Sequence, residues 1–143
     1  MHSNLKPDFS GEWVLDRQAS QLSGGAAAME AGTLRIDHRD PKCGFQISMN
    51  AVGETVERAW ESSVSEEPVG GPEFYSRLFW DQDVLVFECG STSVDETWSM
   101  VWRYQLLESG HRLQAVEQMR GRGGDFDNTW MFNKRRSTDT PAA

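Results

Sequence analysis

Two charged residues fall where an alternating sequence otherwise places apolar side chains. Arg58 lies two residues before Trp60, and Glu117 lies between Ala115 and Met119 at the same spacing. In a β-strand, residues two apart share one face, so both charges would point into an apolar interior. A buried charge is costly unless it is paired, and we therefore expect Arg58 and Glu117 to pair with each other or with a ligand. The alternative is that either residue lies at a rim in water.

These two groups also define the chemistry that an enzyme could perform here. A carboxyl group held away from water can act as a general acid or base, and a guanidinium can polarise a carbonyl group. If the protein is an enzyme, Glu117 and Arg58 are its candidate catalytic residues. The reaction would be a cyclisation or isomerisation that needs no cofactor, with the interior folding the substrate and excluding water.

Six tryptophans in a chain of 143 residues supply a second kind of chemistry. Each ring has a large apolar face and an N–H group that needs a partner, so several rings around one cavity would suit a flat or conjugated ligand. The alternative is that they fill a small barrel. The expected ligand-binding residues are Trp60, Tyr75, Trp98, Met100, Trp102, Tyr104, Trp130, Phe132 and His38.

The elements that must position these residues are strands. From residue 33 onward apolar and polar side chains alternate in segments separated by turn residues, which predicts a meander of antiparallel strands. The expected strands are 11–16, 33–37, 44–50, 55–62, 73–80, 84–89, 96–106, 112–119 and 126–134. We expect an all-β fold, a single antiparallel up-and-down β-barrel of about 8–10 strands, because closing the sheet removes its edges.

Three further segments complete the expected organisation. Residues 26–31 could form one or two helical turns after the first strand, ended by Gly32. The domain would have a lead-in over 1–10, the barrel over 11–136 and a disordered tail over 137–143. Residues 73–88 carry bulky groups on both faces, so the sequence does not tell which face points inward.

Charge and cysteine content exclude several partners. A net charge of −8 repels nucleic acids and anionic membrane surfaces, and no apolar run could enter a membrane or serve as a signal peptide. Cys43 and Cys89 lie far apart without metal-ligand spacing, so we expect two thiols, no metal and no cofactor. The expected protein is cytoplasmic, a monomer or homodimer, and its partner is a small hydrophobic molecule.

The segment Phe9-Ser10-Gly11-Glu12-Trp13-Val14-Leu15 resembles the start of proteins of the calycin superfamily, the lipocalins and fatty-acid-binding proteins. More closely, it is similar to small bacterial lipocalin-like barrel proteins. The resemblance implies that Trp13 closes the barrel floor and that a basic residue of the last strand, Lys134 or Arg135, stacks across it. It departs from fatty-acid-binding proteins in two places: the gap after the first strand is too short for their two-helix lid, and Trp130-Met131-Phe132 occupies the region of their carboxylate clamp.

Three functions follow from these patterns. The first is binding of a small hydrophobic or aromatic molecule inside the barrel, for sequestration or delivery. The second is the cofactor-independent cyclase or isomerase described above. The third is a barrel with a filled core that serves a structural or protein-interaction role.

Overall fold

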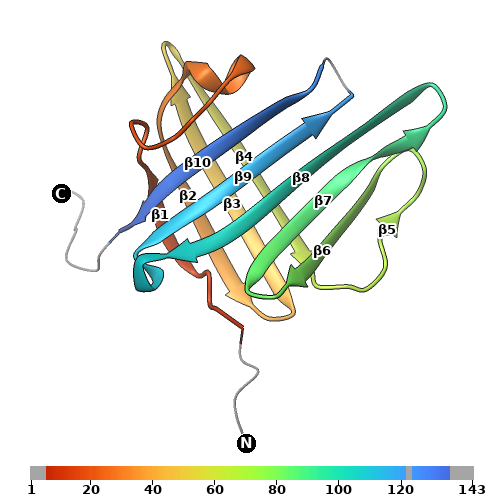
Figure 1. Ribbon diagram of the computed structural model, residues 1–143, viewed down its shortest axis with the longest axis horizontal. Coiled ribbons are helices and arrows are strands. Elements are labelled where there is room, and N and C mark those ends of the chain that lie inside the picture. Colours follow the sequence, from red (N-terminus) through yellow and green to blue (C-terminus); the bar gives the residue numbers. More distant parts are fainter. Residues whose placement is uncertain (1–5, 122–123, 136–143) are drawn as a thin grey trace, which may run out of the picture.

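The alternating segments form one sheet that curls around an apolar interior (Figure 1). The computed structural model describes residues 6–121 and 124–135. Ten antiparallel strands follow the order β4-β3-β2-β1-β10-β9-β8-β7-β6-β5. The strands are β1 (Gly11–Leu15), β2 (Met29–Arg39), β3 (Lys42–Ala51), β4 (Glu54–Ser63), β5 (Val69–Gly70), β6 (Tyr75–Asp81), β7 (Val84–Ser93), β8 (Glu96–Leu107), β9 (Arg112–Arg120) and β10 (Phe126–Lys134). The expected all-β, up-and-down architecture is confirmed.

The short helical segment expected after the first strand is present, but it is shifted toward the N-terminus and does not extend over residues 26–31. The only helical residues between the first two strands are the short 3-10 helix η1 (Gly24–Ala28), and Met29 already begins β2, paired with Ala51. A short alanine-rich stretch has too little helical stability to compete with ladder hydrogen bonds. Gly32 is a strand residue rather than a helix end: a Cβ there would lie 2.2 Å from Met49 Sδ, so the glycine permits close packing of β2 and β3.

The barrel closes through a seam between β4 and β6. Only one parallel bridge, Val64 with Leu78, joins the two sides among the described residues, and the Ser65 N–H donates to the Leu78 carbonyl at 2.9 Å. Two-residue β5, which sequence patterning missed, covers part of the seam by pairing with β6. A cleft of about 450 Å³ remains there, lined by Glu61, Ser62, Ser63, Ser65, Val69, Ser76 and Arg77.

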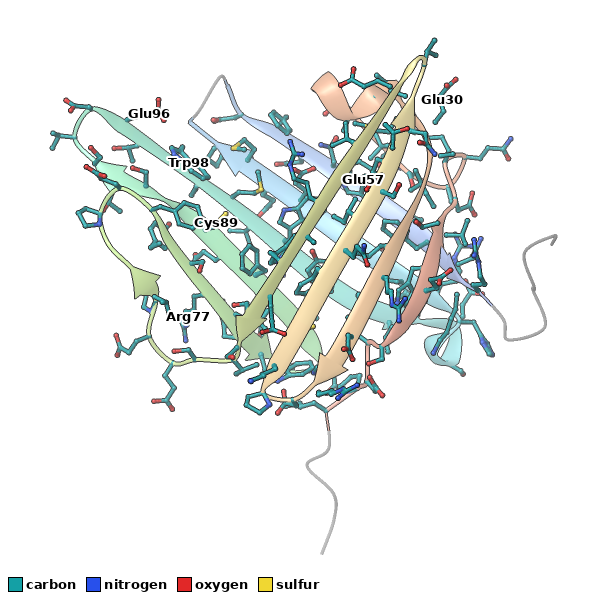
Figure 2. All side chains as sticks on the ribbon, turned by 180° about the vertical axis from the view of Figure 1, so that it is seen from behind. Glu30, Glu57, Arg77, Cys89, Glu96 and Trp98 are labelled. Atoms are coloured by element: carbon teal, nitrogen blue, oxygen red, sulfur yellow. The ribbon has the colours of Figure 1, made fainter. Side chains whose placement is uncertain are left out.

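The barrel has two different ends (Figure 1). The first, called the η1 end here, holds η1 and the hairpins that join β3 to β4, β7 to β8 and β9 to β10. The second, called the Trp13 end, holds the turns after β2, β6 and β8, the last of which contains the 3-10 helix η2 (Glu108–Gly110). In Figure 2, β3 and β4 cross in front of β8, β9 and β10, and side chains occupy the space between them.

Trp13 is fully buried at this end of the barrel, where the resemblance expects a floor residue. Its ring is 0% exposed, and Nε1–H donates to the Phe9 carbonyl at 3.0 Å. Lys134 Nζ lies 5.5 Å from the ring centroid, a cation–π contact. Gly11 makes room for this lysine: its φ is +143°, and a Cβ would lie 2.9 Å from Lys134 Cε. The basic partner of Trp13 is therefore Lys134.

The expectation that Arg135 stacks on the floor tryptophan is wrong. Its guanidinium Nη1 forms an ion pair with Glu12 Oε1 at 2.7 Å, and its backbone N–H donates to the Glu12 carbonyl at 2.8 Å. Trp13 and Lys134 are directly opposite in the β1–β10 register, whereas Arg135 follows one position later. Because side chains alternate along a strand, Arg135 is directed to the outer face beside Glu12.

Cys43 and Cys89 are both buried free thiols. Burial, with smaller contributions from Asp37, Asp40 and Asp8, raises the pKa of Cys43 to about 12. Burial and then Glu88 raise the pKa of Cys89 to about 11. Over the described ranges, no helix is long and apolar enough to cross a membrane, and no cluster of three potential metal ligands is found. The tail expected over 137–143 lies outside the described residues.

Candidate ligand-binding site

The interior near the Trp13 end is filled by the protein's own side chains. Inward-facing residues from opposite sides of the sheet meet there and are less than a tenth exposed. This buried cluster includes Phe9, Trp13, Leu15, Leu34, Ile36, Cys43, Phe45, Leu78, Leu85, Tyr104, Leu113, Ala115, Trp130 and Phe132. Phe132, one of the expected ligand-binding residues, is 3% exposed and belongs to this cluster.

A continuous series of aromatic rings crosses the barrel above this core. Trp60 stacks on Phe45 at a centroid distance of 5.0 Å, and Phe45 stacks on Tyr104 at 5.3 Å. Tyr104 stacks on Trp102 at 6.1 Å, and Trp102 meets Trp130 at the same distance in a tilted arrangement. These five residues, called the aromatic layer here, come from β4, β3, β8 and β10. Offset and tilted contacts of this kind are the favoured geometries of aromatic pairs.

On the η1 side of the aromatic layer, inward-facing side chains keep access to solvent. Trp102 is directly opposite Phe87, and Met100 is directly opposite Cys89, on the same face of the sheet as buried Tyr104. Yet Trp102, Phe87 and Met100 are only half-buried. Solvent therefore reaches the inward face there, and these apolar side chains are accessible for contact with a guest.

Glu117 lies at the edge of this accessible space and is 7% exposed. Its Oε1 accepts from Asn128 Nδ2 at 3.0 Å and from Trp130 Nε1 at 3.1 Å. The Asn128 Oδ1 in turn accepts from the Ser23 backbone N–H at 2.6 Å and from Ser23 Oγ at 3.1 Å. The chain of contacts therefore ties the segment before η1 to the interior carboxylate and to the aromatic layer.

Asn128 was missed by the sequence analysis although a signal for it exists. It alternates with Phe126 and Trp130 on an apolar face, which is the same pattern that singled out Glu117. It is 1% exposed and directly opposite Glu117 in the β9–β10 register. A polar residue on an apolar strand face therefore indicates a buried hydrogen-bonding site whether its side chain is an amide or a charged group.

The expected pairing of Arg58 with Glu117 is wrong. Arg58 has the inward parity, directly opposite Ile47, but it is exposed, and its Nη1 donates to the Glu57 carbonyl at 2.9 Å. Arg58 is exposed because its strand, β4, borders the seam, where water reaches the side chains. Glu117, on β9 between two paired strands, remains inside. The two candidate catalytic residues are thus not brought together.

Tyr75 lies on the outer face of the barrel. It is directly opposite Gly90, whose neighbours Cys89 and Ser91 face inward opposite Met100 and Trp98. Burial, followed by Glu88 and Cys89, raises the pKa of Tyr75. The expectation that it lines the interior is therefore wrong.

The ambiguity over residues 73–88 is settled by the same register. Leu78 and Trp80 face inward, opposite Phe87 and Leu85. Arg77 and Phe79 face outward, where the guanidinium carbon lies 4.3 Å from the ring centroid. Bulky side chains occur on both faces because Arg77 and Phe79 stack on each other on the outer face.

His38 belongs to the closed Trp13 end. Its Nδ1 accepts the Phe9 backbone N–H at 3.2 Å, and its ring lies 5.9 Å from Phe9 and 5.7 Å from Trp80. It is 9% exposed and separated from the accessible space by the core. The structure thus places His38 among the residues that close the barrel, and its expected ligand-binding role is not supported.

Of the remaining expected residues, Trp98, Met100 and Trp102 are half-buried on the inward face, whereas Tyr104 and Trp130 are buried. Trp102 Nε1 donates to Met100 Sδ at 3.1 Å, which fixes the two side chains against each other. Trp98 lies further toward the η1 end, near the hairpin after β7, and its ring is 6.3 Å from the exposed Phe74 ring (Figure 2). Burial raises the pKa of Tyr104, with smaller effects of Cys43, Glu117 and Cys89, so its hydroxyl stays neutral.

Hollows also occur on the outer face of β1 to β4. One of about 600 Å³ is lined by Arg35, Asp37, Gly44, Phe45, Gln46, Ala59, Trp60 and Glu61. Half of these residues are charged or polar, and the hollow lies on the water-facing side of the sheet, which suits an apolar guest poorly. The interior space beside the aromatic layer is therefore the candidate site.

Comparison with solved structures shows the same fold. The fluorescent protein UnaG superposes with a TM-score of 0.62 at 14% identity, covering 89% of this chain and 97% of its own. The REP1-NXSQ fatty acid transporter gives 0.60 at 9% identity, covering 90% and 96%. Fatty-acid-binding protein 1 of Echinococcus granulosus gives 0.57 at 14% identity, covering 90% and 98%. No family model and no curated protein matches the sequence. The chain therefore shares the barrel fold of these structures.

Proposed function

We propose that the protein binds a small, largely apolar molecule in its interior, on the η1 side of the aromatic layer. The observation that carries the proposal is the incomplete burial of inward-facing rings. Trp102 and Phe87 point into the barrel but remain half-buried, whereas Tyr104, two residues along the same face, is 1% exposed. Covering these rings would remove apolar surface from water, which favours binding.

The names of the fold neighbours support the same class of function. Two of the three structures above are described as a fatty acid transporter and a fatty-acid-binding protein. At this level of identity the likeness concerns the fold alone, so the ligand of this chain has to be inferred from its own interior.

The arrangement favours binding over catalysis. A cyclase or isomerase would need a second polar group placed against the substrate beside Glu117. Arg58, the expected second group, is exposed and bonded to the neighbouring Glu57 carbonyl. A carrier needs no such pair.

A titration with the neutral fluorescent probe N-phenyl-1-naphthylamine tests the proposal. We expect saturable binding with a dissociation constant near or below ~10 µM, and Trp102→Ala should weaken it by about tenfold or more. Phe79→Ala is the matched control, because it removes an aromatic ring from the outer face of β6 and should leave affinity unchanged. Circular dichroism verifies that both variants fold. Absence of binding to the folded parent, or equal losses in both variants, would refute the proposal.

A further inference from the structure

We propose that the ligand carries a cationic amine, which Glu117 binds through its second carboxylate oxygen against the rings of Trp102 and Trp130. This inference rests on the proposed function and names the polar group that the apolar guest should bear. It follows from three features of the interior: a carboxylate with a free acceptor, aromatic faces beside it and a lack of buried positive charge.

The free acceptor is Glu117 Oε2. Both hydrogen bonds found for this side chain, from Asn128 and from Trp130, end on Oε1. Within residues 6–121 and 124–135, the fully buried side-chain atoms without a partner are His38 Nε2, Trp60 Nε1 and Arg112 Nε. Glu117 Oε2 does not belong to this set, so this oxygen remains open to contact from the accessible space. The Glu117 side chain is only 7% exposed, and two donors hold its carboxylate in place. The second oxygen is therefore oriented in advance to accept a hydrogen bond from a ligand.

Two indole rings lie next to this carboxylate. Trp130 touches the carboxylate through its own N–H, and Trp102 is directly opposite Glu117 in the β8–β9 register. The two indole rings meet at 6.1 Å, with Tyr104 stacked on Trp102. Aromatic faces attract cations, most strongly when water is excluded, and a carboxylate beside them completes a site for an ammonium group.

Among residues 6–121 and 124–135, the interior offers no buried Lys or Arg to a competing anionic ligand. Glu117 is the one buried Asp or Glu, and no Lys or Arg is buried, in the described part of the chain. Arg58 has inward parity but is exposed at the seam. A fatty acid would place its carboxylate beside the Glu117 carboxylate with no buried Lys or Arg among the described residues to offset the repulsion, which is unfavourable. A protein of net charge −8 also attracts cations at long range.

Displacement of bound N-phenyl-1-naphthylamine by three ligands with the same alkyl chain tests the inference. Dodecylamine, dodecanol and dodecanoate differ only in their polar group. We expect dodecylamine to displace the probe at a concentration about tenfold or more below that of dodecanoate, with dodecanol between them. Equal potency of the three, or a preference for dodecanoate, would overturn the inference while leaving the proposed function intact. Failure of the probe itself to bind refutes the proposed function instead.

Two variants that each remove one negative charge distinguish the local effect of the Glu117 carboxylate on ligand preference from the effect of the protein's overall charge. Glu117→Gln should reduce the preference for dodecylamine to within about twofold, because the amide keeps the shape but loses the charge. Glu57→Gln removes a carboxylate from the exposed face of β4 and should keep the full preference (Figure 2). A preference that persists in Glu117→Gln, or is lost equally in both variants, contradicts the assignment.

A measurement on the unaltered protein covers the case in which Glu117→Gln does not fold. Nuclear Overhauser contacts should connect the methylene next to the nitrogen of bound dodecylamine with the indole protons of Trp130 or Trp102. Contacts from that methylene to other parts of the barrel, with only the terminal methyl near these indoles, would place the amine elsewhere and overturn the proposal.

Discussion

Replacement of Trp13 by alanine should remove a large part of the stability of the barrel. The indole is 0% exposed, and removing a buried tryptophan of this kind costs about 3–5 kcal/mol. The variant also leaves the buried Phe9 carbonyl without its donor, at a cost of about 1–3 kcal/mol. Because the terms overlap, we expect a total loss of about 4–6 kcal/mol, against a typical domain stability of about 5–15 kcal/mol.

Urea unfolding followed by far-UV circular dichroism measures this loss, since that signal does not depend on the deleted fluorophore. Lys134→Met removes the cation above the ring and should cost less than about 1 kcal/mol. Trp13→Phe keeps part of the packing and should fall between the two, at about 2–3 kcal/mol, which also provides a value if the alanine variant does not fold. A loss below about 2 kcal/mol for Trp13→Ala would refute the assignment of Trp13 as the residue that closes the barrel.

Three further predictions concern packing, the interior network and pH. Gly32→Ala should destabilise the protein by about 1–3 kcal/mol, because its Cβ would collide with the adjacent strand, while Gly25→Ala, with open space around it, should leave the urea midpoint unchanged or slightly raised. Asn128→Ala should cost about 2–3 kcal/mol and speed amide exchange in the segment before η1, which it anchors; unchanged exchange there would contradict the linkage. Since the pKa values of Cys43 and Cys89 are raised to about 12 and about 11 in the folded state, from an ordinary 9.0, the unfolded chain loses these protons first. Stability should thus be unaffected by the thiols below about pH 9 and fall above it, less steeply in a Cys43→Ala/Cys89→Ala variant, as followed by urea midpoints.

Sequence patterning predicted the strands well because almost every strand has one face in the interior. Around Trp102 and Trp130, side chains alternate between the interior and the outer face, as a closed sheet requires. This two-residue alternation allowed the strands and their inward faces to be predicted from the sequence. The Gly11-x-Trp13 spacing was likewise visible as a short motif, although the reason for its glycine, the room that Lys134 needs above the indole, comes from the neighbouring strand β10. Features marked by short-range spacing were accessible from the sequence.

Features determined by the position of a strand in the sheet were not accessible. Arg58 and Glu117 show the same pattern, but one lies on a strand that borders the seam and the other on a strand paired on both sides. Tyr75 lies in a stretch with bulky groups on both faces, so the sequence did not tell which face it occupies, and only pairing with Gly90 places it outside. Two-residue β5 depends entirely on its partner strand. Burial of a given side chain depends on such tertiary pairing.

Proton–nitrogen correlation spectra of the six tryptophan indoles test the central claim most directly. On titration with dodecylamine, the indole N–H signals of Trp102 and Trp130 should shift progressively and saturate, because the ligand covers their rings beside Glu117. The signal of Trp13, enclosed at the opposite end, should not move. Shifts confined to residues on the outer face of β1 to β4, or no shifts in the folded protein, would contradict binding in the interior.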